Sequence, residues 1–177
     1  PSGGDYTSRY DTSFFDNCTS KALEKIMARP EYKDKILGFF VNQGYINHLS
    51  GMNHGEYGTS TLRNIMRRVL KHNPDYVLFF EWNEANENTC FQPTVYSGQT
   101  VGRLIKYYSH LSKGKPFAPY AGEDASIPNL TLSHRATLKP GEVLRFELLN
   151  IPDGAPEHTI TAQLKLTDQS GKVLLAF

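Results

Sequence analysis

Two glutamates three positions apart, Glu81 and Glu84, are the residues best suited to acid/base chemistry in this sequence. They enclose Trp82 and Asn83 and follow an apolar run at residues 76–80. An apolar ring beside a carboxyl group raises its pKa, as a general acid requires, and a second carboxylate can then act as its partner. Because an extended chain rises about 3.3 Å per residue, the two Cα atoms lie at most roughly 10 Å apart. That distance allows either carboxyl separation used in glycoside hydrolysis.

A purely structural interpretation of the two glutamates stays open. Their carboxylates would then cap the following loop or pair with arginines of the preceding segment, which are Arg63, Arg67 and Arg68. The place of the motif directly after an apolar strand favours function, because burying Glu81 there is costly unless it is hydrogen-bonded or useful.

The segments around the motif alternate between strand and helix patterns. Residues 36–41 and 76–80 are short apolar runs, which are typical of strands buried on both faces. Helical spacing occurs at 62–70 and 101–111; Thr59 or Ser60 is the expected N-cap of the first helix, and residues 42–58 suggest a long loop. Residues 36–112 therefore predict a strand–helix–strand–helix unit with a parallel sheet, whose strands bind ligands at their carboxyl ends.

The C-terminal third has a different composition. Prolines at 119 and 128 with Gly122 predict a linker at 119–128, and four strand-like segments follow, at 130–135, 142–151, 159–167 and 172–177. We therefore predict an α/β chain in which residues 1–118 form the closing βα units of a TIM barrel. A small β-sandwich-like accessory domain follows at 129–177. Since an eight-fold barrel needs at least about 200 residues, we expect the chain to be a fragment.

A longer order of motifs surrounds the two glutamates. Residues 55–111 contain, in order, Gly55-Glu56-Tyr57, a helix, an apolar strand, Glu81-Trp82-Asn83-Glu84, Thr89, Gln92-Pro93-Thr94 and a final helix. This order resembles the closing part of family 99 glycoside hydrolases and the related barrel domains found beside polysaccharide glycosyltransferases. The sequence departs from that family at Ala85, where glycine is usual, at Gln92, where an acid is usual, and at residues 86–88, which lengthen the loop.

The resemblance implies roles for both glutamates. Glu84 matches the acid/base residue of the family. Glu81 matches the carboxylate proposed to deprotonate the sugar 2-hydroxyl in a retaining mechanism on α-mannosides. A second resemblance is to barrel hydrolases with an Asn-Glu acid/base at the end of strand four, for which Asn83-Glu84 suffices; their nucleophile lies about three strands later, and only one helix and a linker follow here. Both resemblances assign Glu84 the same role.

Aromatic side chains are abundant, with 10 Tyr, 10 Phe and one Trp, and such rings suit the C–H-rich faces of sugars as well as a protein core. The expected substrate-binding residues are Trp82, Asn83, Tyr57, His54 and Tyr45. The Gly-rich loop that holds His54 is more typical of a solvent-exposed loop than of a sugar-binding one. No metal site or cofactor is expected, because no His pair or Cys pair has ligand spacing.

Charge and hydropathy exclude several classes of partner. Lys and Arg number 19 against 18 Asp and Glu, which gives no basic footprint for nucleic acid. No apolar run reaches the roughly 18 residues of a membrane span, and no signal-peptide pattern is present. We expect a parent protein that is secreted or part of the cell envelope. The oligomeric state and the pairing of Cys18 with Cys90 stay open.

Two classes of function follow. The first is a glycoside hydrolase whose full-length parent acts through Glu84 and Glu81 on a glycan substrate, with the isolated fragment inactive. The second is a non-catalytic carbohydrate-recognition or structural module of a polysaccharide-processing protein, which Ala85 favours.

Overall fold

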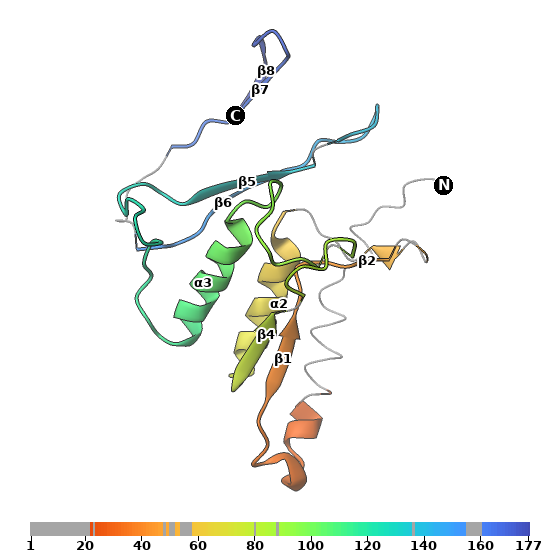
Figure 1. Cartoon of the computed structure of the whole chain (residues 1–177), viewed down its shortest axis with the longest axis vertical. Helices are drawn as coiled ribbons and strands as arrows, with labels where there is room; N and C mark the ends of the chain where they lie inside the picture. The colour runs from red at the N-terminus through yellow and green to blue at the C-terminus, as the bar shows by residue number, and fades with distance from the viewer. Residues whose placement is uncertain are drawn as a thin grey trace.

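The computed structural model describes residues 22, 24–47, 49, 52–53, 58–79, 81–87, 89–135, 137–154 and 161–177. Figure 1 shows how its elements are arranged. In chain order they are the 3₁₀ turn η1 (Pro30–Tyr32), β1 (Gly38–Val41), β2 (Ile46–Asn47), β3 (Met52–Asn53), α2 (Ser60–Lys71), β4 (Tyr76–Phe79), α3 (Thr100–Ser112), β5 (Leu130–His134), β6 (Phe146–Asn150), β7 (Lys165–Thr167) and β8 (Val173–Ala176).

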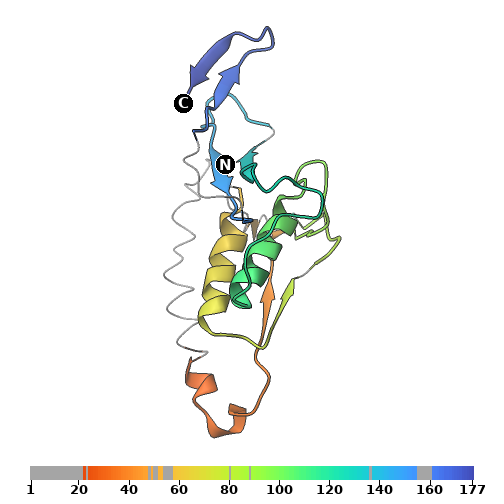
Figure 2. The same cartoon turned by 90° about the vertical axis from the view of Figure 1, so that its left-hand side faces the viewer.

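The strand–helix–strand–helix unit has the predicted parallel pair. Strands β1 and β4 pair in parallel, with Phe39 opposite Val77 and Val41 opposite Phe79. Helix α2 connects them, and Figure 2 shows α2 and α3 together on one side of the pair. The predicted parallel arrangement of the strand segments at 36–41 and 76–80 is confirmed. The barrel stays a prediction, because the described part of this sheet contains two strands.

Both helices form where the apolar period placed them. In α2 the buried side chains are Leu62, Met66 and Val69, which lie three or four positions apart on one face. The helix ends before Asn73, whose positive φ of 44° suits an asparagine beside a proline. In α3 the buried side chains are Val101, Leu104 and Tyr108, and Gly114 follows with a φ of 59°.

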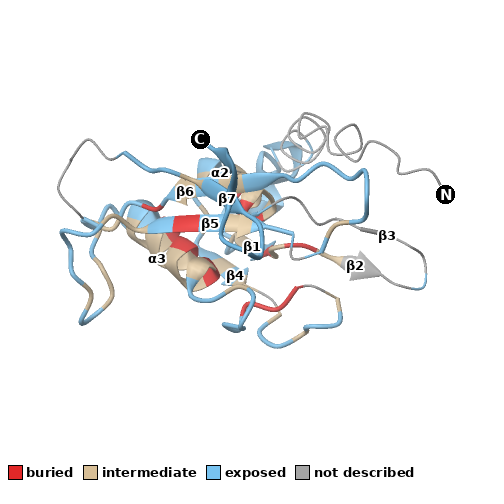
Figure 3. Cartoon of the chain, turned by 90° about the horizontal axis from the view of Figure 1, so that it is seen from above, coloured by how far each residue is buried: buried red, intermediate tan, exposed pale blue. Residues whose placement is uncertain are grey.

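The core lies between the two helices and the inner face of the sheet, and Figure 3 shows buried positions along α3 and on β5. Its buried members are Val41, Leu62, Met66, Val69, Phe91, Val101, Leu104, Tyr108 and Ile151. Ile151 directly follows β6, so the C-terminal third adds a side chain that is only 2% exposed to the same core. The outer face of the β1–β4 pair carries Phe40 and Leu78, which are 65% and 47% exposed. The expectation that both strands are buried on both faces is therefore wrong for the described residues, because both helices pack on the same side of the pair.

The segment after the linker contains strands and no helix among its described residues. Strands β5 and β6 pair antiparallel, as do β7 and β8. Each of these four strands lies within one of the four predicted segments and is shorter than it. The ends of a segment are the positions where hydrogen bonds to the neighbouring strand stop. The β-sandwich and the domain boundaries stay predictions. One difference arises earlier, where residues 42–58, expected as a loop, contain the short antiparallel pair of β2 and β3.

The predicted linker at 119–128 is tied to α3. Arg103 forms an ion pair with Glu123, and the backbone N–H of Tyr120 also donates to Glu123. The Lys106 ammonium donates to the carbonyl of Pro119 at 2.6 Å and lies 4.4 Å from the centre of the Tyr120 ring. Helix α3 therefore holds the chain that leads to β5.

Candidate functional site

The two glutamates lie on a loop at the carboxyl end of β4. We call residues 81–92 the acidic loop; its described residues are 81–87 and 89–92. Glu81 and Glu84 are half-buried, and Asn83 is exposed. The Trp82 side chain is unusually open for its size, with 63% of the residue exposed. The structure thus brings four of the seven predicted site residues together on one loop.

Backbone hydrogen bonds close the acidic loop on itself. The N–H of Phe91 donates to the carbonyl of Glu81 at 3.0 Å, and the N–H of Gln92 donates to the carbonyl of Trp82 at 2.8 Å. The N–H and hydroxyl of Thr89 donate to the carbonyl of Glu84 at 3.3 and 3.2 Å. Because Thr89 and Phe91 are buried, these bonds anchor the exposed half of the loop to the core.

Cys90 ties the acidic loop to the end of β1. Its thiol is buried and free, and Sγ lies 3.3 Å from the carbonyl oxygen of Trp82. The side-chain amide of Gln43 donates to the Cys90 carbonyl. Cys90 therefore acts as a packing residue in this structure, and Cys18 lies outside the described residues.

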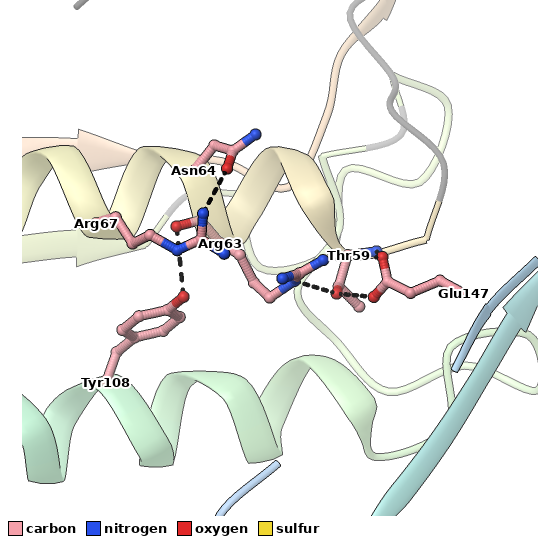
Figure 4. A network of polar contacts seen from close by, with 6 residues as sticks. All are labelled: Thr59, Arg63, Asn64, Arg67, Tyr108 and Glu147. Atoms are coloured by element: carbon pink, nitrogen blue, oxygen red, sulfur yellow. Dashed lines mark hydrogen bonds and ion pairs between the residues drawn. The ribbon is translucent and has the colours of Figure 1, made fainter. Parts of the chain in front are cut away.

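The arginines that offered a structural explanation for the glutamates are engaged elsewhere. Arg63 pairs with Glu147 of β6 at 3.1 Å, and the Arg67 guanidinium contacts Asn64 on its own helix (Figure 4). Among the residues that the structure describes, the carboxylates of Glu81 and Glu84 make no hydrogen bond or ion pair. Two half-buried carboxylates are thus left available to solvent or to a ligand.

The other predicted site residues are placed only in part. Tyr45 is half-buried and precedes β2, so it comes from the segment after β1 rather than from the acidic loop. His54 and Tyr57 lie outside the described residues. In the described ranges no group of three or more His, Cys, Asp or Glu side chains is placed to hold a metal ion.

A polar cluster between α2 and β6 was not foreseen from the sequence. Glu147 accepts hydrogen bonds from the Thr59 hydroxyl at 2.5 Å and from the Thr59 N–H at 3.3 Å (Figure 4). Arg63 donates to the Thr59 hydroxyl at 2.9 Å. Thr59 occupies the predicted N-cap position, but its own hydroxyl makes no capping bond. The Glu147 carboxylate accepts the Thr59 N–H from 88 positions away and places a negative charge at the start of α2, where the helix dipole favours it.

The same cluster continues to Tyr108 of α3. The Tyr108 hydroxyl donates to the carbonyl of Arg63 at 3.3 Å. Burial raises the pKa of Tyr108, and the nearby positive charges of Arg67 and Arg63 oppose that rise. Helices α2 and α3 are therefore joined by a polar contact as well as by the core.

A groove of about 560 Å³ lies between the start of α3 and β5, and no residue of the acidic loop lines it. Gln99, Thr100 and Arg103 line it on the helix side. Asp124, Asn129 and Thr131 line it on the other. The sequence gives no sign of this groove, because residues 119–128 have the composition of a linker.

No described helix has the length and apolar character needed to cross a membrane. Comparison of the chain with family models, curated proteins and solved structures finds no match.

Proposed function

We propose that this chain belongs to a carbohydrate-active protein in which the acidic loop contacts a glycan and Glu84 and Glu81 act as its acid/base pair. One observation supports this most. Two half-buried glutamates without a described partner flank an exposed tryptophan on a loop at the carboxyl end of a parallel strand. Ligands bind at this edge of parallel α/β sheets because the loops diverge there over a rigid platform.

Trp82 supplies the surface for binding. A tryptophan with 63% of its surface exposed leaves a large apolar ring face in water. The C–H face of a sugar ring covers that area, while Asn83 and the glutamates accept or donate hydrogen bonds to its hydroxyls.

The chemistry follows the residues. Glu84 as a carboxylic acid protonates the leaving glycosidic oxygen while Glu81 removes the proton of the 2-hydroxyl. The sugar O2 then attacks C1 as the glycosidic bond breaks. That attack forms a 1,2-epoxide. In the second step Glu84 takes a proton from water, the water oxygen attacks C1 and opens the epoxide, and Glu81 returns its proton to O2. The configuration at C1 is retained after two displacements.

Turnover of the full-length parent protein on α-mannosides and a broad glycan panel tests this assignment. Glu84→Gln should lower kcat by about 10²–10⁴-fold, because an amide keeps the shape but delivers no proton. Glu81→Gln should lower it comparably, since no carboxylate remains to activate the 2-hydroxyl. Glu87→Gln is the matched control from the same loop and should leave kcat unchanged. Turnover untouched by Glu84→Gln contradicts the catalytic role.

The second candidate is a recognition module, which the Ala85 departure favours. In that case the full-length parent binds glycans without turning them over, and Trp82→Ala weakens binding while Glu84→Gln does not. We expect either form in a protein that is secreted or held at the cell envelope, where polysaccharides are met.

A further inference from the structure

The groove between α3 and β5 is lined by a buried threonine, Thr131, whose hydroxyl has no partner among the described residues. Thr131 lies on β5 opposite Leu149 in the ladder and is only 9% exposed. Its hydroxyl makes no hydrogen bond with the residues that the structure describes, and the residue lines the groove. The other two buried threonines, Thr59 and Thr89, both have hydrogen-bonded hydroxyls.

Further polar groups without a described partner line the same space. The side chains of Gln99, Thr100 and Asn129 make no hydrogen bond with described residues, so two amides and a hydroxyl are available there. Asp124 accepts from the N–H and hydroxyl of Ser126 through Oδ1 only, which leaves Oδ2 available. Ser126 lowers the pKa of Asp124 through those bonds, so its acceptor oxygens persist as a carboxylate.

The charges of the groove select against anions. Its one arginine, Arg103, is already paired with Glu123, whereas Asp124 adds negative charge. Apolar surface lies beside these groups, since Ile127 is 62% exposed. A phosphate or carboxylate ligand would meet like charge, while a neutral ligand with many hydroxyls can donate to the carboxylates and amides and place its C–H faces on the apolar side chains.

We propose that this groove is a second glycan-binding site, which holds a neutral sugar through the Thr131 hydroxyl, the Asn129 and Gln99 amides and the Asp124 carboxylate. The volume of about 560 Å³ is within the range of small-ligand sites, which is about 300–1,000 Å³. None of its lining residues belongs to the acidic loop. A sugar bound in the groove therefore does not contact Glu81 or Glu84, and the role of the groove is to hold a polysaccharide chain rather than to cleave it. The proposal stands whether or not the acidic loop is catalytic.

The test is a backbone amide NMR titration of the chain with neutral oligosaccharides of mannose, glucose, xylose and N-acetylglucosamine at millimolar concentration. The protein should come from a host without N-glycosylation, because Asn129-Leu130-Thr131 is an acceptor sequence and a glycan at Asn129 would enter the groove. At least one oligosaccharide should shift the amides of residues 99–103 and 129–132. Thr131→Val removes only the hydroxyl and should weaken that binding about fivefold, the value of one hydrogen bond.

Two controls separate this site from the acidic loop and from simple misfolding. Thr167→Val makes the same change at an exposed position of β7 and should leave the affinity unchanged. Trp82→Ala should abolish shifts in the acidic loop and leave those of the groove, which distinguishes failure of one site from failure of the other. Thr131→Val should unfold at the same or higher urea concentration than the parent chain. Absence of groove shifts with every oligosaccharide, unchanged affinity in Thr131→Val, or shifts with spermidine alone would overturn the proposal.

Discussion

The contact of Glu147 with the start of α2 should be worth several times more than an ordinary surface ion pair. Glu147 accepts two hydrogen bonds from Thr59 and one from Arg63, and the Arg63 and Glu147 side chains are 22% and 18% exposed. Removing one partner of a fully buried pair costs about 3–5 kcal/mol, and an exposed pair is worth about 0–1 kcal/mol. For this partly buried pair we expect Glu147→Ala to lower the free energy of unfolding by about 2–3 kcal/mol.

Urea denaturation followed by circular dichroism measures this difference. For a chain of this length the corresponding fall in Tm is about 5–10 °C. Glu147→Gln keeps the shape and one acceptor oxygen but loses the charge, so it should show about half the effect of the alanine. The control is Glu142→Gln, because Glu142 also faces an arginine, Arg135 at 3.4 Å, but the two side chains are 36% and 50% exposed. That variant should change the free energy by less than about 0.5 kcal/mol.

A double-mutant cycle isolates the pair itself. Arg63→Met combined with Glu147→Gln should give a coupling energy of about 1–2 kcal/mol. The same cycle on Arg135 and Glu142 should give a value near zero. If Glu147→Gln costs no more than Glu142→Gln, or if the two cycles agree, then the carboxylate does not stabilise the start of α2 and the reasoning from the contact geometry fails.

Two further predictions concern α3 and the segments beside it. Burial raises the pKa of Tyr108 above its ordinary value of 10.0, so its contribution to stability is complete below pH 10 and is lost as the pH rises through the folded-state pKa. Tyr108→Phe should therefore lose less stability than the parent chain between neutral pH and about pH 11, whereas Tyr96→Phe, at a position 90% exposed, should follow the parent. Gly154 has a φ of 88°, and an added Cβ would lie 2.5 Å from the carbonyl oxygen of Phe117, so Gly154→Ala should cost about 2–4 kcal/mol in urea denaturation. Gly141 has a similar φ of 84° with open space around it, so Gly141→Ala should cost about 1 kcal/mol; equal costs would show that the Phe117 contact carries no energy.

Local patterns in the sequence were sufficient for the helices and for the parallel pair. The apolar spacing of Leu62, Met66 and Val69 specifies one buried helix face, and Asn73-Pro74 ends that helix because the residue before proline avoids helical angles. The apolar runs at 36–41 and 76–80 are joined by a helix, and two strands joined through a helix usually pair in parallel. The position of Glu81 and Glu84 after β4 follows from the same local information.

Other features depend on contacts between residues far apart in the chain. Glu147 meets Thr59 across 88 positions, and Ile151 enters a core built mainly from residues 41–108. Nothing within a helical or strand period of Glu147 distinguishes it from an exposed glutamate, because its partners are set by how β6 packs on α2. The groove beside Thr131 likewise exists only once residues 119–128 are tied to α3 and β5 is laid beside it. Sequence therefore determined which segments become helices and strands and where the acidic motif stands, since those depend on neighbours within a few residues. Tertiary packing alone decided which carboxylates are paired, which hydroxyl is buried without a partner and where a groove opens, since those depend on the docking of distant segments.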